Sequence, residues 1–364
     1  MLTKATIRQM AKAATTMMTA SAILVACSLM EVDRSDCPQG LNVNVKYDYN
    51  TQQANLFNDH VGGITVYVFD REGKLLTQRS ASNDAERQPL KERDFHFEIT
   101  DLPVGDYQLL ATAMQKDELE AMKTKGAKFR INHPGQGEAC QQLQVRLDHD
   151  APDAEGWANV CHDGLPLDTL WMTPTLVAAT TEADNPTFAT LSLMRQTKNI
   201  HVALMQTVDG QLLRHEDYEV TITADNARLR CDGSIEPDVP LRYTPYQAWT
   251  TTLADDATPT GNSVIDRAAH YEFFTSRLMA KSSSPTLITV RRKDTGETVF
   301  AYNLPRLLAN GRSAYEYQRW TEQEYLDREY DYDLQIILAG DRWDSVVLRI
   351  ATLSWSRRIQ NVDL

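Results

Sequence analysis

Apolar and polar residues alternate at every second position in many segments of this chain, and this period constrains the fold more than any other feature. In 41–49, leucine, valine and tyrosine alternate with asparagine, lysine and aspartate. A strand with one buried face has this period because successive side chains point to opposite faces. Similar strand-like runs occupy 64–69, 95–99, 107–113, 143–147, 188–193, 200–205, 218–224, 287–291, 298–302, 332–338 and 346–350. The pattern predicts an all-β fold.

The length and one polar stretch predict two domains. The chain has 364 residues, enough for two ordinary domains with separate cores. A polar, proline-containing stretch, 180–187, separates two strand-rich halves and is a candidate linker. We therefore predict two tandem β-sandwich domains, 41–184 and 185–364. A few short helices are expected, one within 116–124 and one after Thr321, where a glutamate three residues later gives capping-box spacing.

One turn is similar to those of a known sandwich class. In Leu102-Pro103-Val104-Gly105-Asp106-Tyr107, proline fixes φ and glycine permits a tight bend just before an apolar strand. A Leu-Pro-x-Gly-x-Tyr turn of this kind resembles those of transthyretin-like β-sandwiches. The resemblance implies that the two predicted domains are transthyretin-like.

The N-terminal segment has the features of a lipoprotein signal. Three basic residues precede an apolar, small-residue run that ends in Leu24-Val25-Ala26-Cys27. A membrane-spanning helix is the alternative, but the run is shorter than the roughly 20 residues that a bilayer core requires. We predict a signal peptide at 1–26, lipidation of Cys27, and a lipidated tether at 27–40 that leads from the outer membrane to the first domain. Several acyl chains would make this attachment stable.

The charge of the chain excludes one class of partner. The net charge is −13, with 37 basic and 50 acidic residues. The predicted signal peptide carries three of the basic residues and none of the acidic ones, so 34 against 50 remain, a net charge of −16. A surface this acidic repels the phosphate backbone, so we expect no nucleic acid partner.

Four cysteines follow Cys27 in the chain, namely Cys37, Cys140, Cys161 and Cys231. They form no Cys-x-x-Cys pair and no close group with histidine, so a zinc site is not expected. In an exported protein they are disulfides or unpaired buried thiols. Four cysteines allow three pairings, and the sequence does not choose among them.

No motif of an enzyme is present. The sequence lacks a Gly-x-Ser-x-Gly elbow, a phosphate-binding glycine loop, a dinucleotide fingerprint and a His-Glu-x-x-His helix. A glycosidase pair of carboxylates assembled only by the fold is the remaining catalytic alternative. The acidic group Asp148, Asp150, Asp153 and Glu155 lacks the glycine and the terminal glutamate of a helix-loop-helix calcium site, so solvated loop acids are expected. We predict a protein that is not an enzyme and has no cofactor or metal.

Several strings, in order along the chain, are similar to those of one family. They are Asp36-Cys37-Pro38, Val45-Lys46-Tyr47-Asp48-Tyr49-Asn50, Phe57, Ile64-Thr65-Val66-Tyr67-Val68-Phe69-Asp70 with Gly73-Lys74, the Leu102 to Tyr107 turn, Arg195-Gln196-Thr197-Lys198-Asn199-Ile200, and Thr275-Ser276-Arg277-Leu278-Met279. With the lipoprotein signal and the tandem sandwiches, the chain resembles the fimbrium anchoring subunits of Bacteroidales, the FimB/Mfa type.

This resemblance implies a role and partners. Members sit at the base of a fimbrium, tie its shaft subunits to the outer membrane through the N-terminal lipid, and help to end or regulate its elongation. They also join by lending a C-terminal strand to a groove in another subunit. Here the possible donor strand has apolar anchors at Val346, Leu348, Ile350, Leu353 and Trp355. The alternative is that 351–364 closes its own domain as the last strand.

A second function of a different class is also compatible with the sequence. A surface lipoprotein that binds glycans beside an outer-membrane transporter has the same anchor and a similar fold. Glycan binders usually display an aromatic platform. Trp157, Trp171, Trp249 and Trp320 are the candidates for one, and packing in a core is the alternative for each.

The lipid attachment gives a direct test. Cys27→Ala removes the thiol that would carry the diacylglycerol, so we expect loss of all label after growth with a radioactive fatty acid, and release of the protein from the membrane fraction. Wild-type chain grown in parallel is the control. Label that persists in Cys27→Ala would contradict the assignment.

Overall fold

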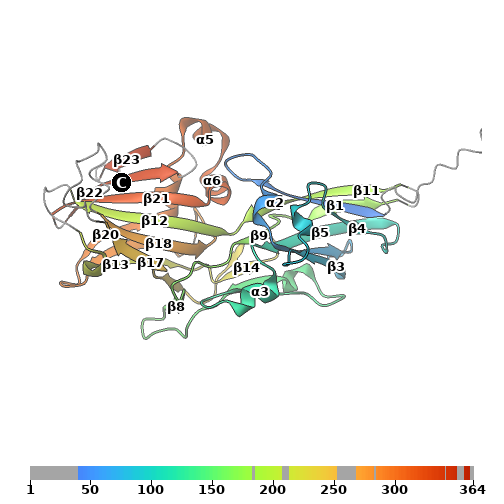
Figure 1. Ribbon diagram of the computed structural model, residues 1–364, viewed down its shortest axis with the longest axis horizontal. Helices are drawn as coiled ribbons and strands as arrows, with labels where there is room; N and C mark the ends of the chain where they lie inside the picture. Colours follow the sequence, from blue (N-terminus) through green and yellow to red (C-terminus); the bar gives the residue numbers. More distant parts are fainter. Residues whose placement is uncertain are drawn as a thin grey trace, which may run out of the picture. The chain divides into compact units, whose positions relative to one another are not determined.

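Four β-sheets and five short α-helices make up the part of the chain that the computed structural model describes (Figure 1). The described residues are 40–182, 185–206, 213–251, 268–282, 284–340, 342–350 and 356–360, with the backbone alone for 349–350 and 356–360. The predicted signal peptide at 1–26, the lipidation site Cys27 and almost all of the tether lie outside these residues.

The first sheet has eight strands, most of them from the N-terminal half. In sheet order they are β3 (Leu75–Ser82), β2 (Gly63–Phe69), β5 (Gly105–Met114), β9 (Leu170–Met172), β11 (Thr187–Arg195), β1 (Leu41–Tyr49) and β4 (His96–Ile99), and β10 (Val177–Thr181) also pairs with β5. β1 lies between β4, which is antiparallel to it, and β11, which is parallel to it. The predicted strand at 41–49 is therefore central.

The two parts of this sheet share one core. The apolar side chains of β1 and β11 pack in the same buried cluster as those of β2 and β5, so the sheet is folded over as a sandwich. Tyr47 and Trp171 lie inside it with ring centroids 5.6 Å apart. The polar partners of the alternating pattern face the other way, which explains the period of two in the sequence.

The hairpin between β2 and β3 depends on one glycine. Gly73 has a φ of +78°, a conformation that L side chains rarely adopt. Its amide donates to the Asp70 carbonyl, and the Asp70 carboxylate accepts from the Lys74 amide at 2.8 Å. The conformational freedom of glycine thus permits this turn.

Two further sheets come mainly from the C-terminal half. The six-stranded sheet has the order β17 (Gln247–Thr250), β18 (Ala269–Ser276), β12 (Thr197–Gln206), β21 (Asp331–Ala339), β22 (Arg342–Ile350) and β23 (Ser356–Gln360). The five-stranded sheet has the order β20 (Thr298–Asn303), β19 (Leu287–Arg292), β13 (Tyr218–Ala224), β16 (Leu241–Tyr243) and β8 (Ala158–Val160). Their inward side chains form a second large core.

A small fourth sheet joins segments from both halves of the chain. Its order is β15 (Ile235–Glu236), β14 (Arg228–Arg230), β7 (Gln144–Leu147) and β6 (Phe129–Asn132). In addition, β11 ends at Arg195 and β12 begins at Thr197, so a nearly continuous run of strand passes from the first sheet into the six-stranded one (Figure 1). Strand pairing thus crosses the predicted boundary between 184 and 185. The division of the chain into two domains at this boundary stays a prediction.

The helices are short and lie in connections between strands. They are α2 (Phe57–His60), α3 (Glu118–Lys123), α4 (Leu304–Ala309), α5 (Ala314–Arg319) and α6 (Glu322–Arg328), with 3-10 turns η1 (Pro89–Lys91), η2 (Cys140–Gln142) and η3 (His215–Asp217). Thr321 caps α6 by accepting from the Glu324 amide at 3.2 Å, as its position predicted. Among the described helices, none is long and apolar enough to cross a membrane. The predicted fold class, an all-β sandwich fold with a few short helices, is confirmed.

Two positions on β11 test the first core. Leu191 is fully buried in it, whereas Phe188 is 62% exposed three residues earlier. We expect Leu191→Ala to lower the free energy of unfolding by about 3 kcal/mol because it leaves a cavity, and Phe188→Ala to change it by less than about 0.5 kcal/mol. Denaturant titration of the two variants measures the difference. Equal losses would contradict the assignment of this core.

Candidate functional site

The predicted donor strand lies inside the six-stranded sheet. β22 pairs with β21 in antiparallel register, with Leu348 opposite Leu334 and Val346 opposite Ile336. Val346 and Leu348 are 0% and 2% exposed and belong to the second core. Complete burial of such a side chain contributes about 1.5–3 kcal/mol. These two residues therefore already stabilise the chain's own fold.

The other side of β22 carries one more strand. β23 is antiparallel to it, with Ile359 opposite Val346 and Ser356 opposite Arg349. Among the described strands, β23 is the end of its sheet and has a neighbour on one side only. Backbone groups at such an edge pair readily with an added strand. Of the remaining predicted anchors, Ile350 lies opposite Tyr332, while Leu353 and Trp355 lie outside the described residues.

A cluster of buried charged residues lies where β11 passes into β12. We call Arg195, Lys198, Arg277, Asp327 and Glu329 the buried ionic cluster; each is between 0% and 8% exposed. Arg277 donates two bonds to Asp327, from Nε to Oδ1 at 2.8 Å and from Nη2 to Oδ2 at 2.7 Å. This geometry is the strong, planar form of an arginine–carboxylate pair.

Lys198 and Glu329 complete the hydrogen bonding of the cluster. The Lys198 ammonium donates to the Glu329 carbonyl at 2.7 Å. The Glu329 carboxylate accepts from the amides of Tyr330 and Asp331 and from the Thr51 hydroxyl. Burial lowers the pKa of Lys198 to about 7, although the Asp327 carboxylate opposes the shift. Burial likewise raises the pKa of Glu329.

The cluster is structural rather than catalytic. A lysine with a pKa near 7 is a candidate base or nucleophile, but Lys198 is fully buried and no substrate reaches its amine. Arg195 lies with its guanidinium 4.3 Å from the Tyr330 ring centroid. The sequence alone predicted no role for Arg195, Lys198 or Arg277, although all three lie in segments that resemble the anchoring subunits. Arg195 and Lys198 stand in a polar string, Arg195 to Asn199, between two apolar strand runs, and this interruption was their signal.

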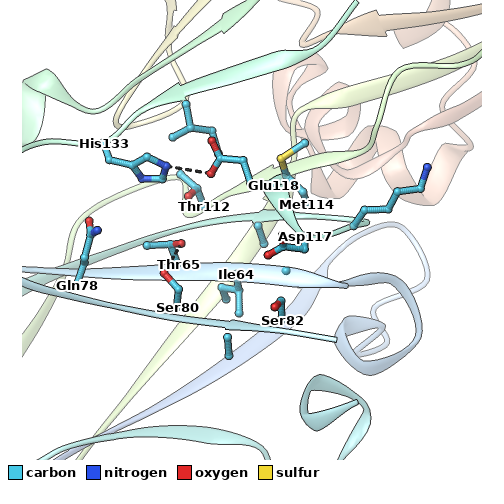
Figure 2. A pocket seen from close by; sticks show the side chains of 15 residues that line it. Ile64, Thr65, Gln78, Ser80, Ser82, Thr112, Met114, Asp117, Glu118 and His133 are labelled. Carbon is cyan, nitrogen blue, oxygen red and sulfur yellow. Dashed lines mark hydrogen bonds and ion pairs between the residues drawn. The ribbon is translucent and has the colours of Figure 1, made fainter. Parts of the chain in front are cut away.

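A polar pocket of about 250 Å³ lies over β2, β3 and β5 (Figure 2). Its wall carries the hydroxyls of Thr65, Ser80 and Thr112, and Thr65 and Ser80 hydrogen-bond each other at 2.8 Å. On the opposite wall His133 Nε2 and Glu118 Oε2 are 2.9 Å apart. Among its lining residues, all of them described, none carries a phenyl, phenol or indole ring. The pocket therefore offers no phenyl, phenol or indole face on which a sugar ring could stack, and its His133 imidazole is paired with Glu118.

The four candidate tryptophans do not form one platform. Trp171 and Trp320 are 1% and 6% exposed and belong to the two cores. Trp249 stacks on His270, with ring centroids 4.9 Å apart, and Trp157 lies 6.0 Å from the Arg242 guanidinium. Trp171 and Trp320 thus pack in a core, which was the alternative to an aromatic platform for each tryptophan.

Three of the four acidic loop residues, Asp148, Asp150 and Asp153, have partners other than a metal ion. Asp148 forms two bonds with Arg130, Asp153 pairs with Arg242 at 2.8 Å, and Asp150 accepts from the Cys161 thiol. In the described part of the chain, no three histidine, cysteine, aspartate or glutamate side chains are grouped so that they could hold a metal ion.

Comparisons with known proteins connect these features to a family. A family model described as "Fimbrillin-A associated anchor proteins Mfa1 and Mfa2" matches residues 34–361. No curated protein matched the chain. The match covers both sandwiches and all the residues of the buried ionic cluster.

Solved structures share the fold over most of the chain. A putative adhesin of Bacteroides thetaiotaomicron is 25% identical, with a TM-score of 0.70 over 90% of this chain and 100% of that one. A structure from the same species described as putative polysaccharide binding proteins is also 25% identical, with a TM-score of 0.68 over 90% and 100% of the two chains. The fimbrial anchor protein Mfa2 of Porphyromonas gingivalis is 19% identical, with a TM-score of 0.59 over 88% and 99%, and shows the same fold.

The buried lysine predicts a pH dependence of stability. In the unfolded chain Lys198 keeps its ordinary pKa of 10.5, whereas its folded pKa is about 7. Between these values the unfolded state binds more protons, so the contribution of Lys198 to the free energy of unfolding rises with pH. We expect wild type to gain about 1 kcal/mol per pH unit relative to Lys198→Met between pH 7 and 9.

Denaturant titrations at several pH values measure this difference. Lys91→Met, at an exposed position, is the matched control and should run parallel to wild type. If the curve of Lys198→Met also ran parallel to that of wild type, the pKa of the Lys198 amine would not be lowered in the folded chain.

Proposed function

Because the chain belongs to the family of fimbrillin-A associated anchor proteins, we propose that it is a basal fimbrial subunit that attaches a shaft to the outer membrane and helps to end its elongation. The observation that carries the proposal is the family match over 34–361, which includes nearly everything after the predicted signal peptide. The shared fold with a fimbrial anchor protein supports it.

The membrane side of this function rests on Cys27. In the proposal its lipid holds the chain at the outer membrane, and 27–40 lead to β1, which begins at Leu41. Fourteen extended residues span at most about 50 Å. β1 lies between the edge strand β4 and β11, so the tether leads into an inner strand of the first sheet rather than an edge strand.

The shaft side of the proposal lies at the C-terminal edge. Donation of Val346 and Leu348 would remove two buried side chains from the second core, at about 1.5–3 kcal/mol each, and would break the pairing with β21. Exchange of β23 breaks pairing on one side only. We therefore place the exchanged segment after β22, within 351–364, and leave Val346, Leu348 and Ile350 in the chain's own sheet.

This arrangement also gives a reason for an end to elongation. Once the last strand has been exchanged with one shaft subunit, the chain has no second donor strand at that edge for a further subunit. The same strand, once exchanged, forms a single junction with the shaft. The chain would thus connect to the fimbrium at one end and to lipid at the other.

Glycan capture, the second function compatible with the sequence, has less support. One similar structure is described as a polysaccharide binding protein. However, the polar pocket is lined by no phenylalanine, tyrosine or tryptophan, and Trp171 and Trp320 are buried.

Removal of the exchanged segment tests the shaft side. Deletion of 351–364 from the full lipidated chain leaves β22 and both cores in place, so we expect a folded protein that still incorporates fatty acid. Its capture of fimbriae should fall at least tenfold, measured as shaft subunits that sediment with the membrane fraction.

A shorter deletion, 361–364, removes only residues after β23 and is the matched control; it should anchor fimbriae normally. A folded, lipidated 351–364 deletion that holds as many fimbriae as wild type would rule out strand donation from this tail.

A further inference from the structure

Two cysteines distant in sequence lie at neighbouring ends of paired strands. Cys140 opens η2, directly before β7, and Cys231 directly follows β14. β7 and β14 are antiparallel, and Arg230 opposite Gln144 is the last pair at this end. Cys231, the next residue after Arg230, therefore lies near the start of β7. The Leu143 amide donates to the Cys140 carbonyl at 3.0 Å, so the η2 turn folds Cys140 back toward the same point.

The two side chains share one apolar environment. Cys140 is 4% exposed in a cluster with Tyr67, Phe69 and Leu143, and Cys231 packs against this cluster. Both line a cavity of about 520 Å³. Burial and the neighbouring Cys140 thiol raise the pKa of Cys231 to about 12. Cys161 lies elsewhere, where its thiol donates to Asp150.

Both thiols are free in the structure, and we propose that in the exported protein Cys140 and Cys231 form a disulfide. This disulfide would tie the segment before β7, which packs on β2 and β5 of the first sheet, to the segment after β14 in the C-terminal half. The inference rests on the export that the proposed function requires, because an oxidising compartment is where such bonds persist.

The chemistry is thiol–disulfide exchange with a disulfide-bearing thiol oxidant. The Cys231 thiolate, the more accessible of the two, attacks a sulfur of the oxidant; one oxidant thiolate leaves, and a mixed disulfide forms. The Cys140 thiolate then attacks the Cys231 sulfur and releases the second oxidant thiolate. The two cysteine protons end on the reduced oxidant. The raised pKa of Cys231 keeps its thiolate scarce, so the oxidation is continued until the number of free thiols no longer changes.

The linkage closes a long segment of chain. A disulfide between 140 and 231 restricts the unfolded ensemble, and the restriction grows with the size of the loop. For a loop this large we expect the unfolding midpoint to rise by about 5 °C or more. Cys140→Ser and Cys231→Ser should each lose this rise, whereas Cys161→Ser should keep it.

Peptide mapping identifies the bond directly. The full chain is oxidised with glutathione disulfide, alkylated with iodoacetamide, and digested with trypsin without reductant. Cys140 then lies in the peptide 131–146, Cys231 in 231–242, and Cys37 in 35–46. We expect one linked species of 131–146 with 231–242, two hydrogen atoms lighter than its parts. A second sample is alkylated in intact cells before lysis.

The outcomes separate this inference from the anchoring function. The linked species in both samples supports the disulfide. Alkylated thiols at Cys140 and Cys231 in either sample, or a link from either one to Cys37 or Cys161, would overturn it. The purified sample contains no membrane or shaft, so its result does not depend on anchoring, which the Cys27→Ala and tail-deletion experiments read separately.

Discussion

The buried ionic cluster depends on the ion pair between Arg277 and Asp327, which joins two charged side chains by two hydrogen bonds. Both residues are almost fully buried, so both charges have left water at a large cost in free energy. The cost is offset only while the pair and its surrounding hydrogen bonds are intact. Arg277 also donates to the Gly233 carbonyl, and Gln323 donates to Asp327. Loss of one partner would destabilise the fold by about 3–5 kcal/mol.

The buried ionic cluster joins segments that no local pattern brings together. Arg277 follows β18, Asp327 belongs to α6, and Lys198 lies at the start of β12. Glu329 reaches the Thr51 hydroxyl in the loop after β1. In this arrangement no buried side-chain nitrogen or oxygen of the five cluster residues lacks a hydrogen-bond partner. We infer that the cluster selects a single arrangement of these segments, since an apolar contact would tolerate small shifts and buried charges do not.

The sequence predicted the parts of this fold that have a local cause. The alternation in Tyr218–Ala224 marked β13 from its first residue to its last, and Thr321 marked the start of α6. Strands of two or three residues are too short to show a period, and β8 and β14 exist because a strand distant in sequence pairs with each. The buried ionic cluster and the pair of cysteines have the same origin. The alternation at Val346 and Leu348 predicted a strand, but alternation does not show whether that strand joins a sheet of its own chain or a sheet of another subunit.

β11 and β12 form a nearly continuous run of strand, and a force that pulls on the two ends of the chain would act along it. β1 runs parallel to β11, and β12 runs parallel to β21 in the second sandwich. A pull on the tether opposed by a pull from the far end of the chain would slide these parallel strands along each other. Hydrogen bonds loaded in this direction share the force and break together, whereas a hairpin peeled from its end yields one bond at a time. In the proposed anchoring role, the topology thus places ladders that resist shear, rather than hairpins that open one bond at a time, along the line of tension between the membrane and the fimbrium.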